Sequence, residues 1–249
     1  MVGVLLIGGG LGWFVLTREA EPVRLRLALE EGQSHVYRIE STSETGVDIR
    51  GLGRKLSTQM EGLLKLDVRK VKGAVARVQG DLTVFSFSAQ GSVVPELRRV
   101  RGRMRIHRAG QVYGGLIGTA DGLPVLMLPA LSPLLPETPM RPGDTHRTDG
   151  VRLFARKDPL VEGTTRFVRY EEVQGVQLAV LEGSFTTHVE KDRALGTGEL
   201  RVDMQARIDP STGTVHDAEG TVHIDVVGGR GMGDAFTSTQ TFRLLPPNG

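Results

Sequence analysis

Apolar and polar residues alternate along most of the chain after residue 22. From Leu200 to Ile208, every second position is apolar and the positions between are polar or charged. Successive side chains of a β-strand point to opposite faces, so this pattern predicts strands with one buried and one solvated face. No long segment has the period of a helix, and only short helical pieces are expected, at 94–98 and 124–135. The sequence therefore predicts a mostly β, antiparallel fold.

Short turn signals separate the alternating runs. Lys72-Gly73 and Gln174-Gly175 each stand between two such runs, as expected for tight hairpins. The run from Asp209 to Gly213 indicates a longer turn. The chain contains 33 glycines and 12 prolines, which suits many strands joined by turns. We expect a curved antiparallel sheet or half-barrel.

The β region divides into two candidate halves, 22–121 and 143–246. The sequence GQSH at 32–35 resembles GDTH at 143–146, and 71–78 resembles 173–180. The spacing differs between the two matches, so a duplication and the ordinary likeness of β turns are equally good explanations. The paired histidines, His35 and His146, are predicted to cap turns.

A proline-rich apolar segment, 122–142, separates the two halves. It combines leucine and methionine with Pro124, Pro129, Pro133, Pro136, Pro139 and Pro142. Prolines this dense cannot occupy central strands, and an exposed linker would be less apolar. We predict a strap that packs over an open sheet face or inside a curved one. The alternative is a patch that dips into a membrane or binds a partner.

The N-terminal residues are predicted to form a membrane anchor over 1–18. Residues 2–16 carry no charge and include Gly8 and Gly12, whose spacing would let a membrane helix pack closely on another helix. This run spans about 22 Å as a helix, so flanking residues must extend it toward the roughly 30 Å of a bilayer core. A cleaved signal peptide is the main alternative, although cleavage after Ala20 would put Arg18 where a small residue is expected. A buried core strand is a third.

A resemblance bears on location. The order EGQ…Y near residue 31, LP…P…PGDT before residue 146 and DPSTG at 209–213 resembles a poorly characterised group of bacterial envelope β proteins. That group is exported or lipid-anchored, and some members are similar in outline to half-barrel carriers of lipoproteins or lipids. The resemblance implies an extracytoplasmic domain, periplasmic or at the cell surface, whereas arginines just after the anchor favour the cytoplasm. The chain departs from the group at His146, usually a large aromatic, and lacks a lipoprotein cysteine.

No motif indicates an enzyme. The absence of cysteine excludes disulfides, thiolate metal sites and cysteine nucleophiles. Neither a nucleophile elbow, a zinc-protease helix nor a phosphate loop is found, and the resemblance carries no catalytic residues. His188, Glu190 and Asp192 would share a strand face, but such spacing is common on any solvated strand. We therefore predict no catalytic, cofactor-binding or metal-binding residues.

The most distinctive local feature is a row of arginines. Arg99, Arg101, Arg103 and Arg105 would line one face of a strand. They would be either a solvated face paired with acidic neighbours, or a surface for a partner or for anionic headgroups. Nucleic acid is disfavoured because no aromatic residue interleaves the row and the net charge is only +2.

These features predict a non-catalytic, membrane-anchored envelope protein, an accessory subunit that docks on a larger membrane assembly. The alternative is a carrier or sensor that holds a lipid or other apolar ligand in a half-barrel. The expected partners are the membrane and other membrane-protein subunits, with lipid as the alternative ligand and no nucleic acid.

Overall fold

The computed structural model describes residues 21–49, 52–93, 98–113, 130–152, 160–192, 196–228 and 235–247. The predicted anchor, 1–18, with Gly8 and Gly12, lies outside these residues. Within them, no helix has the length and hydrophobicity needed to cross a membrane.

The regular secondary structure of the described residues consists of β-strands. They are β1 (Ser34–Ile49), β2 (Leu52–Lys72), β3 (Val75–Ala89), β4 (Ser92–Val93), β5 (Arg98–His107), β6 (Val112–Tyr113), β7 (Thr145–Val151), β8 (Leu160–Val173), β9 (Val176–Asp192), β10 (Gly196–Asp209), β11 (Thr214–Val227) and β12 (Ala235–Leu245). The predicted mostly β fold is confirmed. The helix expected at 124–135 is wrong for its described part, because residues 130–135 form bends and extended chain that pack on the sheet.

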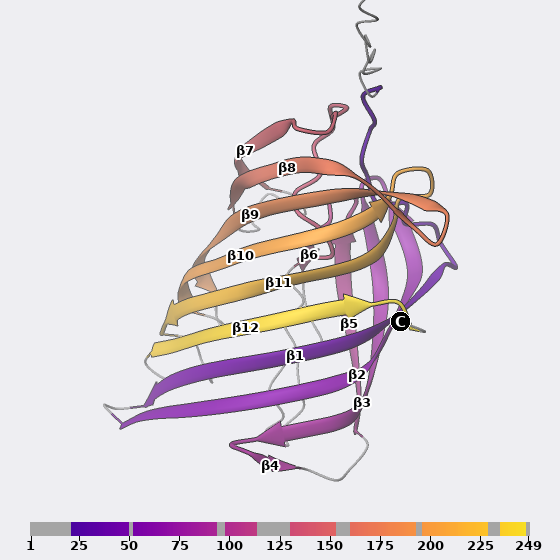
Figure 1. The fold of residues 1–249 in the computed structure, drawn as a ribbon. Coiled ribbons are helices and arrows are strands. Elements are labelled where there is room, and N and C mark those ends of the chain that lie inside the picture. Colours follow the sequence, from indigo (N-terminus) through magenta and orange to yellow (C-terminus); the bar gives the residue numbers. More distant parts are fainter. Residues whose placement is uncertain are drawn as a thin grey trace, which may run out of the picture.

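All strands belong to one antiparallel sheet. Its order is β6-β5-β3-β2-β1-β12-β11-β10-β9-β8-β7, and β4 pairs with β3. The first and last long strands lie side by side in the middle, where Ser43 pairs with Gln240 (Figure 1). The described edges of the sheet are therefore β6, with the unpaired part of β5, and β7.

Alternation places one face of the sheet in the core. Leu64 and Leu66 of β2 are buried, as is every second residue of β10 from Val202 to Ile208, while the residues that alternate with them face solvent or lie at intermediate depth. The largest fully buried side chains include Phe167, Phe185, Phe242, Ile39 and Leu181. This sheet face, called the inner face below, holds the core, and the opposite outer face carries most of the charge.

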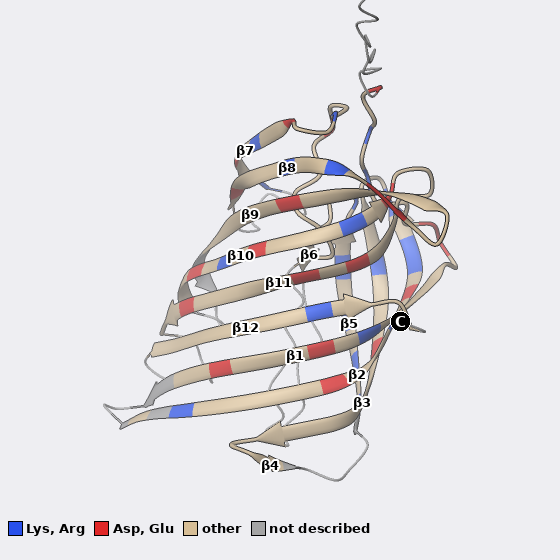
Figure 2. Ribbon diagram, in the orientation of Figure 1, with Lys and Arg blue, Asp and Glu red and all other residues tan. Residues whose placement is uncertain are grey.

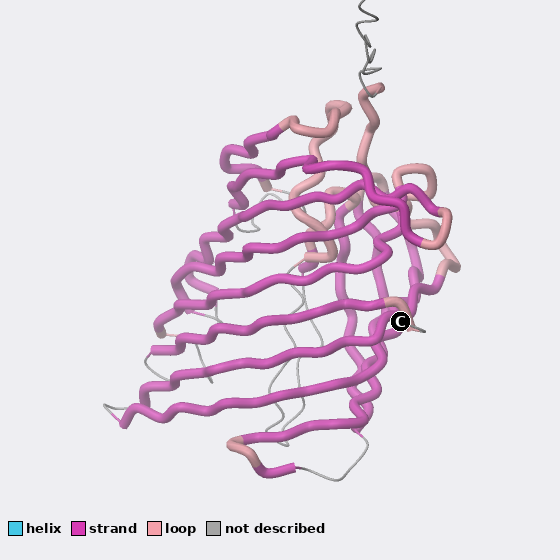
Figure 3. Tube along the Cα trace, in the orientation of Figure 1, coloured by secondary structure: helices cyan, strands magenta, loops and turns pink. Residues whose placement is uncertain are grey.

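Two non-strand segments pack at one end of the inner face, where most of the described loops gather (Figure 3). Residues 130–136, the described middle of the strap, are all buried. The Leu131 and Leu135 amides donate to carbonyls at Gly110 and Ala109, at 2.8 and 3.0 Å. Residues 23–29 lie beside the strap, joined to it by a bridge between Val23 and Met140. These contacts satisfy backbone groups that burial would otherwise leave unpaired.

The two halves of the sequence begin with the same local structure. The Gly32 amide donates to the carbonyl of Val68 at 2.9 Å, and the Gly143 amide donates to that of Phe167 at 2.6 Å. Both glycines have positive φ, 90° and 95°. Each following strand starts two residues later, and β2 and β8 each shift register just after the contact, at Val68/Lys70 and Phe167/Arg169. His35 and His146 are the second residues of β1 and β7, so their predicted role as turn caps is wrong.

Candidate functional site: a cationic surface on the outer face

The arginine row lies on the outer face of β5. Met104 and Ile106 point into the core, so Arg99, Arg101 and Arg103 point outward, where they are exposed. Strand β5 pairs with β3 from Arg98 to His107, but β6 covers only its end, at Arg105 and Ile106. The predicted row therefore forms a line of cations along a strand near the sheet edge.

Strand β3 places only one carboxylate directly opposite this row. Directly opposite the four arginines stand Thr83, Asp81, Gln79 and Arg77. Arg101 alone has a carboxylate opposite it, and its Nε donates to Asp81 at 2.7 Å. Arg105 faces Arg77 and stacks on the ring of Tyr113, 4.4 Å from its centroid. The register thus places a carboxylate directly opposite one of the four arginines.

The positive charge continues onto β2. Lys70 pairs with Arg77, which extends the row that begins at Arg105. The carboxylate in the next row, Asp67, contacts Lys65 at 3.0 Å and Arg69 at 3.2 Å. These cations and the Ser34 hydroxyl lower the pKa of Asp67, so this carboxylate is already engaged. We call the following residues the cationic surface: Lys70, Arg77, Arg99, Arg101, Arg103 and Arg105.

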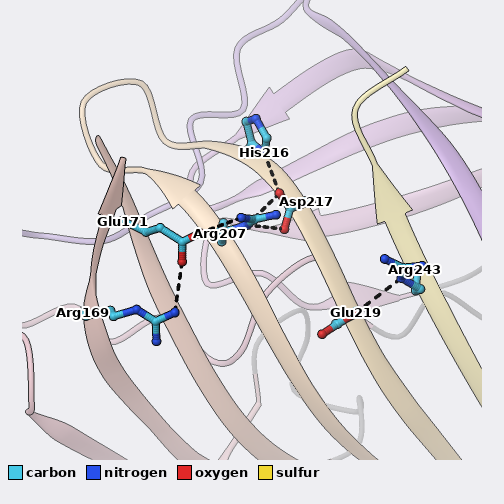
Figure 4. Close-up of polar contacts among 7 residues, drawn as sticks. All are labelled: Arg169, Glu171, Arg207, His216, Asp217, Glu219 and Arg243. Carbon is cyan, nitrogen blue, oxygen red and sulfur yellow. Dashed lines mark hydrogen bonds and ion pairs between the residues drawn. The ribbon is translucent and has the colours of Figure 1, made fainter. Parts of the chain in front are cut away.

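The outer face elsewhere is charged but balanced. Red and blue bands are mixed over β9 to β12, β1 and β2 (Figure 2). In the close-up, Arg207 of β10 lies between Asp217, at 2.8 Å, and Glu171, at 3.0 Å, and Glu171 also accepts from Arg169 (Figure 4). The hydrogen bond to Asp217 is the main cause of the raised pKa of Arg207.

A second chain of ion pairs crosses the central strands. Arg243 of β12 lies 3.6 Å from Glu219 and 3.4 Å from Glu40, and Arg38 of β1 lies between Glu40 and Glu61. On these strands each arginine has a carboxylate beside it. The cationic surface differs from these central strands in its ion pairing. Within the described residues, no ion pair is formed by Arg99, Arg103, Arg77 or Lys70.

Two other places hold histidines that could take part in chemistry. His188 lies 3.2 Å from Glu162 and 3.8 Å from Glu199, but across the described ranges no group of three or more such side chains is arranged to hold a metal ion. His35 lines a small apolar pocket with Leu27, Leu66 and Leu131, and its Nε2 is buried without a hydrogen bond. Burial lowers the pKa of His35. The sequence could not show this pocket, because its walls come from distant segments.

The comparisons with known proteins add little. No family model and no curated protein matches the chain. Among solved structures, DynF from the dynemicin biosynthesis pathway of Micromonospora chersina is 12% identical, with a TM-score of 0.24 over 92% of this chain and 88% of that chain. This likeness is too weak to indicate a shared fold or function. The candidate site consequently depends on the chain's own geometry.

Proposed function

We propose that this chain is a non-catalytic envelope protein, held at a membrane by its apolar N-terminal segment, that serves as an accessory subunit of a larger membrane assembly. The cationic surface is its docking site. The observation that carries the proposal is a contrast on one sheet face: Arg207 and Arg243 are paired with carboxylates, whereas Arg99 and Arg103 have no ion pair within the described residues.

Repulsion among the cations of this surface favours binding of an acidic partner. Like charges directly opposite each other on a sheet are destabilising, and Arg105 stands opposite Arg77. A carboxylate-rich partner would remove this repulsion and would be attracted over roughly a Debye length. These cations are exposed, so their main effect is to attract a partner through long-range electrostatics. The complex is therefore expected to form quickly and to weaken with salt.

Co-purification from the membranes of its own cells tests this function. The full chain, extracted in mild detergent, should retain membrane proteins in fixed ratio. Replacing Arg99, Arg101 and Arg103 by glutamine should release them without lowering the unfolding temperature. Replacing three arginines from the balanced part of the outer face, Arg166, Arg169 and Arg201, is the control. A wild-type chain that purifies alone, or a triple variant that keeps its partners, would contradict the proposal.

A second candidate, a carrier or sensor of a lipid or other apolar ligand with a polar head, has one supporting observation. Polar side chains replace apolar ones at adjoining inner-face positions of β1, β2 and β12: Ser41, Ser43, Thr45, Thr58, Ser238 and Gln240. They bond to one another, as in the 3.0 Å contact between Thr45 and Ser238 and the 2.8 Å contact between Ser43 and Thr58. Because these groups are satisfied already, this candidate ranks second.

Mass spectrometry of an organic extract separates the two candidates. A carrier should yield one lipid class at about one molecule per chain. An extract without lipid, from protein purified without delipidating detergent, would remove the carrier function and leave the docking function intact.

A further inference from the structure

Beside the cationic surface, the sheet has an edge that no strand of the described residues pairs. The path of strand pairing ends at β6, which contacts β5 only at Arg105 and Ile106. Residues 98–104 of β5 have no strand partner on that side among the residues that the structure describes. A free strand edge is a template on which an extended segment can add.

Two hydrogen bonds at the end of β5 show which way its backbone groups point. The His107 amide donates to the Gln111 carbonyl at 2.9 Å, across the turn toward β6, and the Arg108 amide donates to Ala74 on the side of β3. In a strand, the amide and carbonyl of every second residue point the same way. Arg99, Arg101 and Arg103 therefore present their backbone groups to the free edge and their side chains to the outer face.

From this juxtaposition we propose that the β5 edge binds an extended acidic segment of the partner as an added strand. This rests on the proposed function and specifies its partner. A residue paired with Arg99, Arg101 or Arg103 through the backbone would place its side chain beside that arginine on the outer face. The segment is therefore one with glutamate or aspartate at every second position.

A second copy of the same edge does not fit. Two β5 strands paired antiparallel would set arginine against arginine along the whole contact, which is destabilising. The alternative is that the arginines only protect the sheet edge from aggregation, as charged edge residues often do. In that case, binding of an acidic ligand would not depend on the spacing of its acidic residues. Spacing is thus the property to test.

The test uses the full chain in detergent and capped octapeptides. One peptide alternates glutamate and valine, and its control has the same composition with all glutamates in one block. The alternating peptide should bind, with the block peptide roughly tenfold weaker, and replacing Arg99 and Arg103 by glutamine should weaken binding roughly three- to tenfold. The pair Arg166→Gln and Arg201→Gln is the matched control and should leave binding unchanged.

Backbone methylation of the peptide makes the test sharper. Added strands use the amides of alternate residues, here those of the glutamates that pair with the arginines. N-methylation of the glutamates should abolish binding, and N-methylation of the valines should not. Equal binding by alternating and block peptides, insensitive to methylation, would overturn edge addition and leave a purely electrostatic docking surface.

Failure of every peptide to bind would also overturn edge addition. The docking function would still be decided separately, by whether the triple arginine variant loses its co-purifying membrane proteins.

Discussion

At residue 213 the turn after β10 lies against the segment that precedes the sheet. Gly213 has φ +67°, and a Cβ built there would come within 2.5 Å of the Arg26 carbonyl oxygen and 2.6 Å of the Ala28 nitrogen. Both contacts are with backbone, which cannot rotate away. Gly73 has a similar φ, +60°, but open space around it.

These two glycines make a matched pair for mutation. Gly73→Ala should cost about 1 kcal/mol, the penalty of a left-handed conformation. Gly213→Ala should cost at least about 1 kcal/mol more, because it also displaces residues 26–28. Urea unfolding of both variants measures the difference, and equal losses would show that the segment 23–29 does not pack on this turn as described.

His35 should make the fold sensitive to mild acid. Its imidazole faces Leu27, Leu29, Leu66, Val68 and Val215, with no charged group in the pocket. Because burial lowers the pKa of His35, the unfolded chain takes up a proton first as pH falls below about 6.5. Stability is therefore lost from that pH down to the lowered pKa of the folded state, and then levels off.

His35→Leu should remove this part of the pH dependence. The leucine fits an apolar pocket and carries no proton, so the unfolding temperature should fall less between pH 7.5 and 5 than in wild type. Burial also lowers the pKa of His107, so some dependence should remain. An equally steep fall in His35→Leu would place the acid sensitivity elsewhere.

At the scale of elements, the strap is a structural part of the core. Leu134 is 3% exposed in the strap, whereas Leu63 is 39% exposed on the outer face of β2. Leu134→Ala should cost about 2–4 kcal/mol because it leaves a cavity, and Leu63→Ala less than about 1 kcal/mol. Urea titration measures both, and a negligible loss for Leu134→Ala would favour a strap that leaves the sheet to bind a membrane or partner.

The sequence predicted strands well where one face is apolar. The alternation from Leu200 to Ile208 became β10, and Lys72-Gly73 and Gln174-Gly175 form the expected hairpins. The far half of β1, SETGVD, is mostly polar on both faces, so periodicity could not show how far that strand extends. Hydrogen bonds to β12, almost two hundred residues away, hold it in the sheet.

The candidate site was predictable only in part. Spacing alone put Arg99, Arg101, Arg103 and Arg105 on one face of a strand, because side chains alternate. Their surroundings depend on which residues of β3 stand opposite, and one position of register would bring different neighbours. That is why the absence of an ion pair at Arg99 and Arg103, and the stretch of β5 that no described strand pairs, emerge only from the three-dimensional arrangement.

For the molecule as a whole, membrane binding and folding should depend on different parts of the chain. Removing residues 1–20 should release the chain from membranes in high salt, while far-ultraviolet circular dichroism and unfolding temperature stay unchanged, because the described sheet begins after this segment. The intact chain, treated alike, is the control. An intact chain that washes off in high salt would contradict the anchor.

The central claim is that the cationic surface contacts a membrane-protein partner, and site-specific photo-crosslinking tests it most directly. Gln79 stands beside Arg103 on the outer face, and replacing it with a photoreactive residue keeps every cation. Gln205, half-buried on the outer face of β10 beside Glu182, is the matched control. We expect one crosslinked membrane protein, with an acidic segment at the attachment point, from position 79 and none from position 205. Identical products from both positions, or none from position 79 in native membranes, would contradict it.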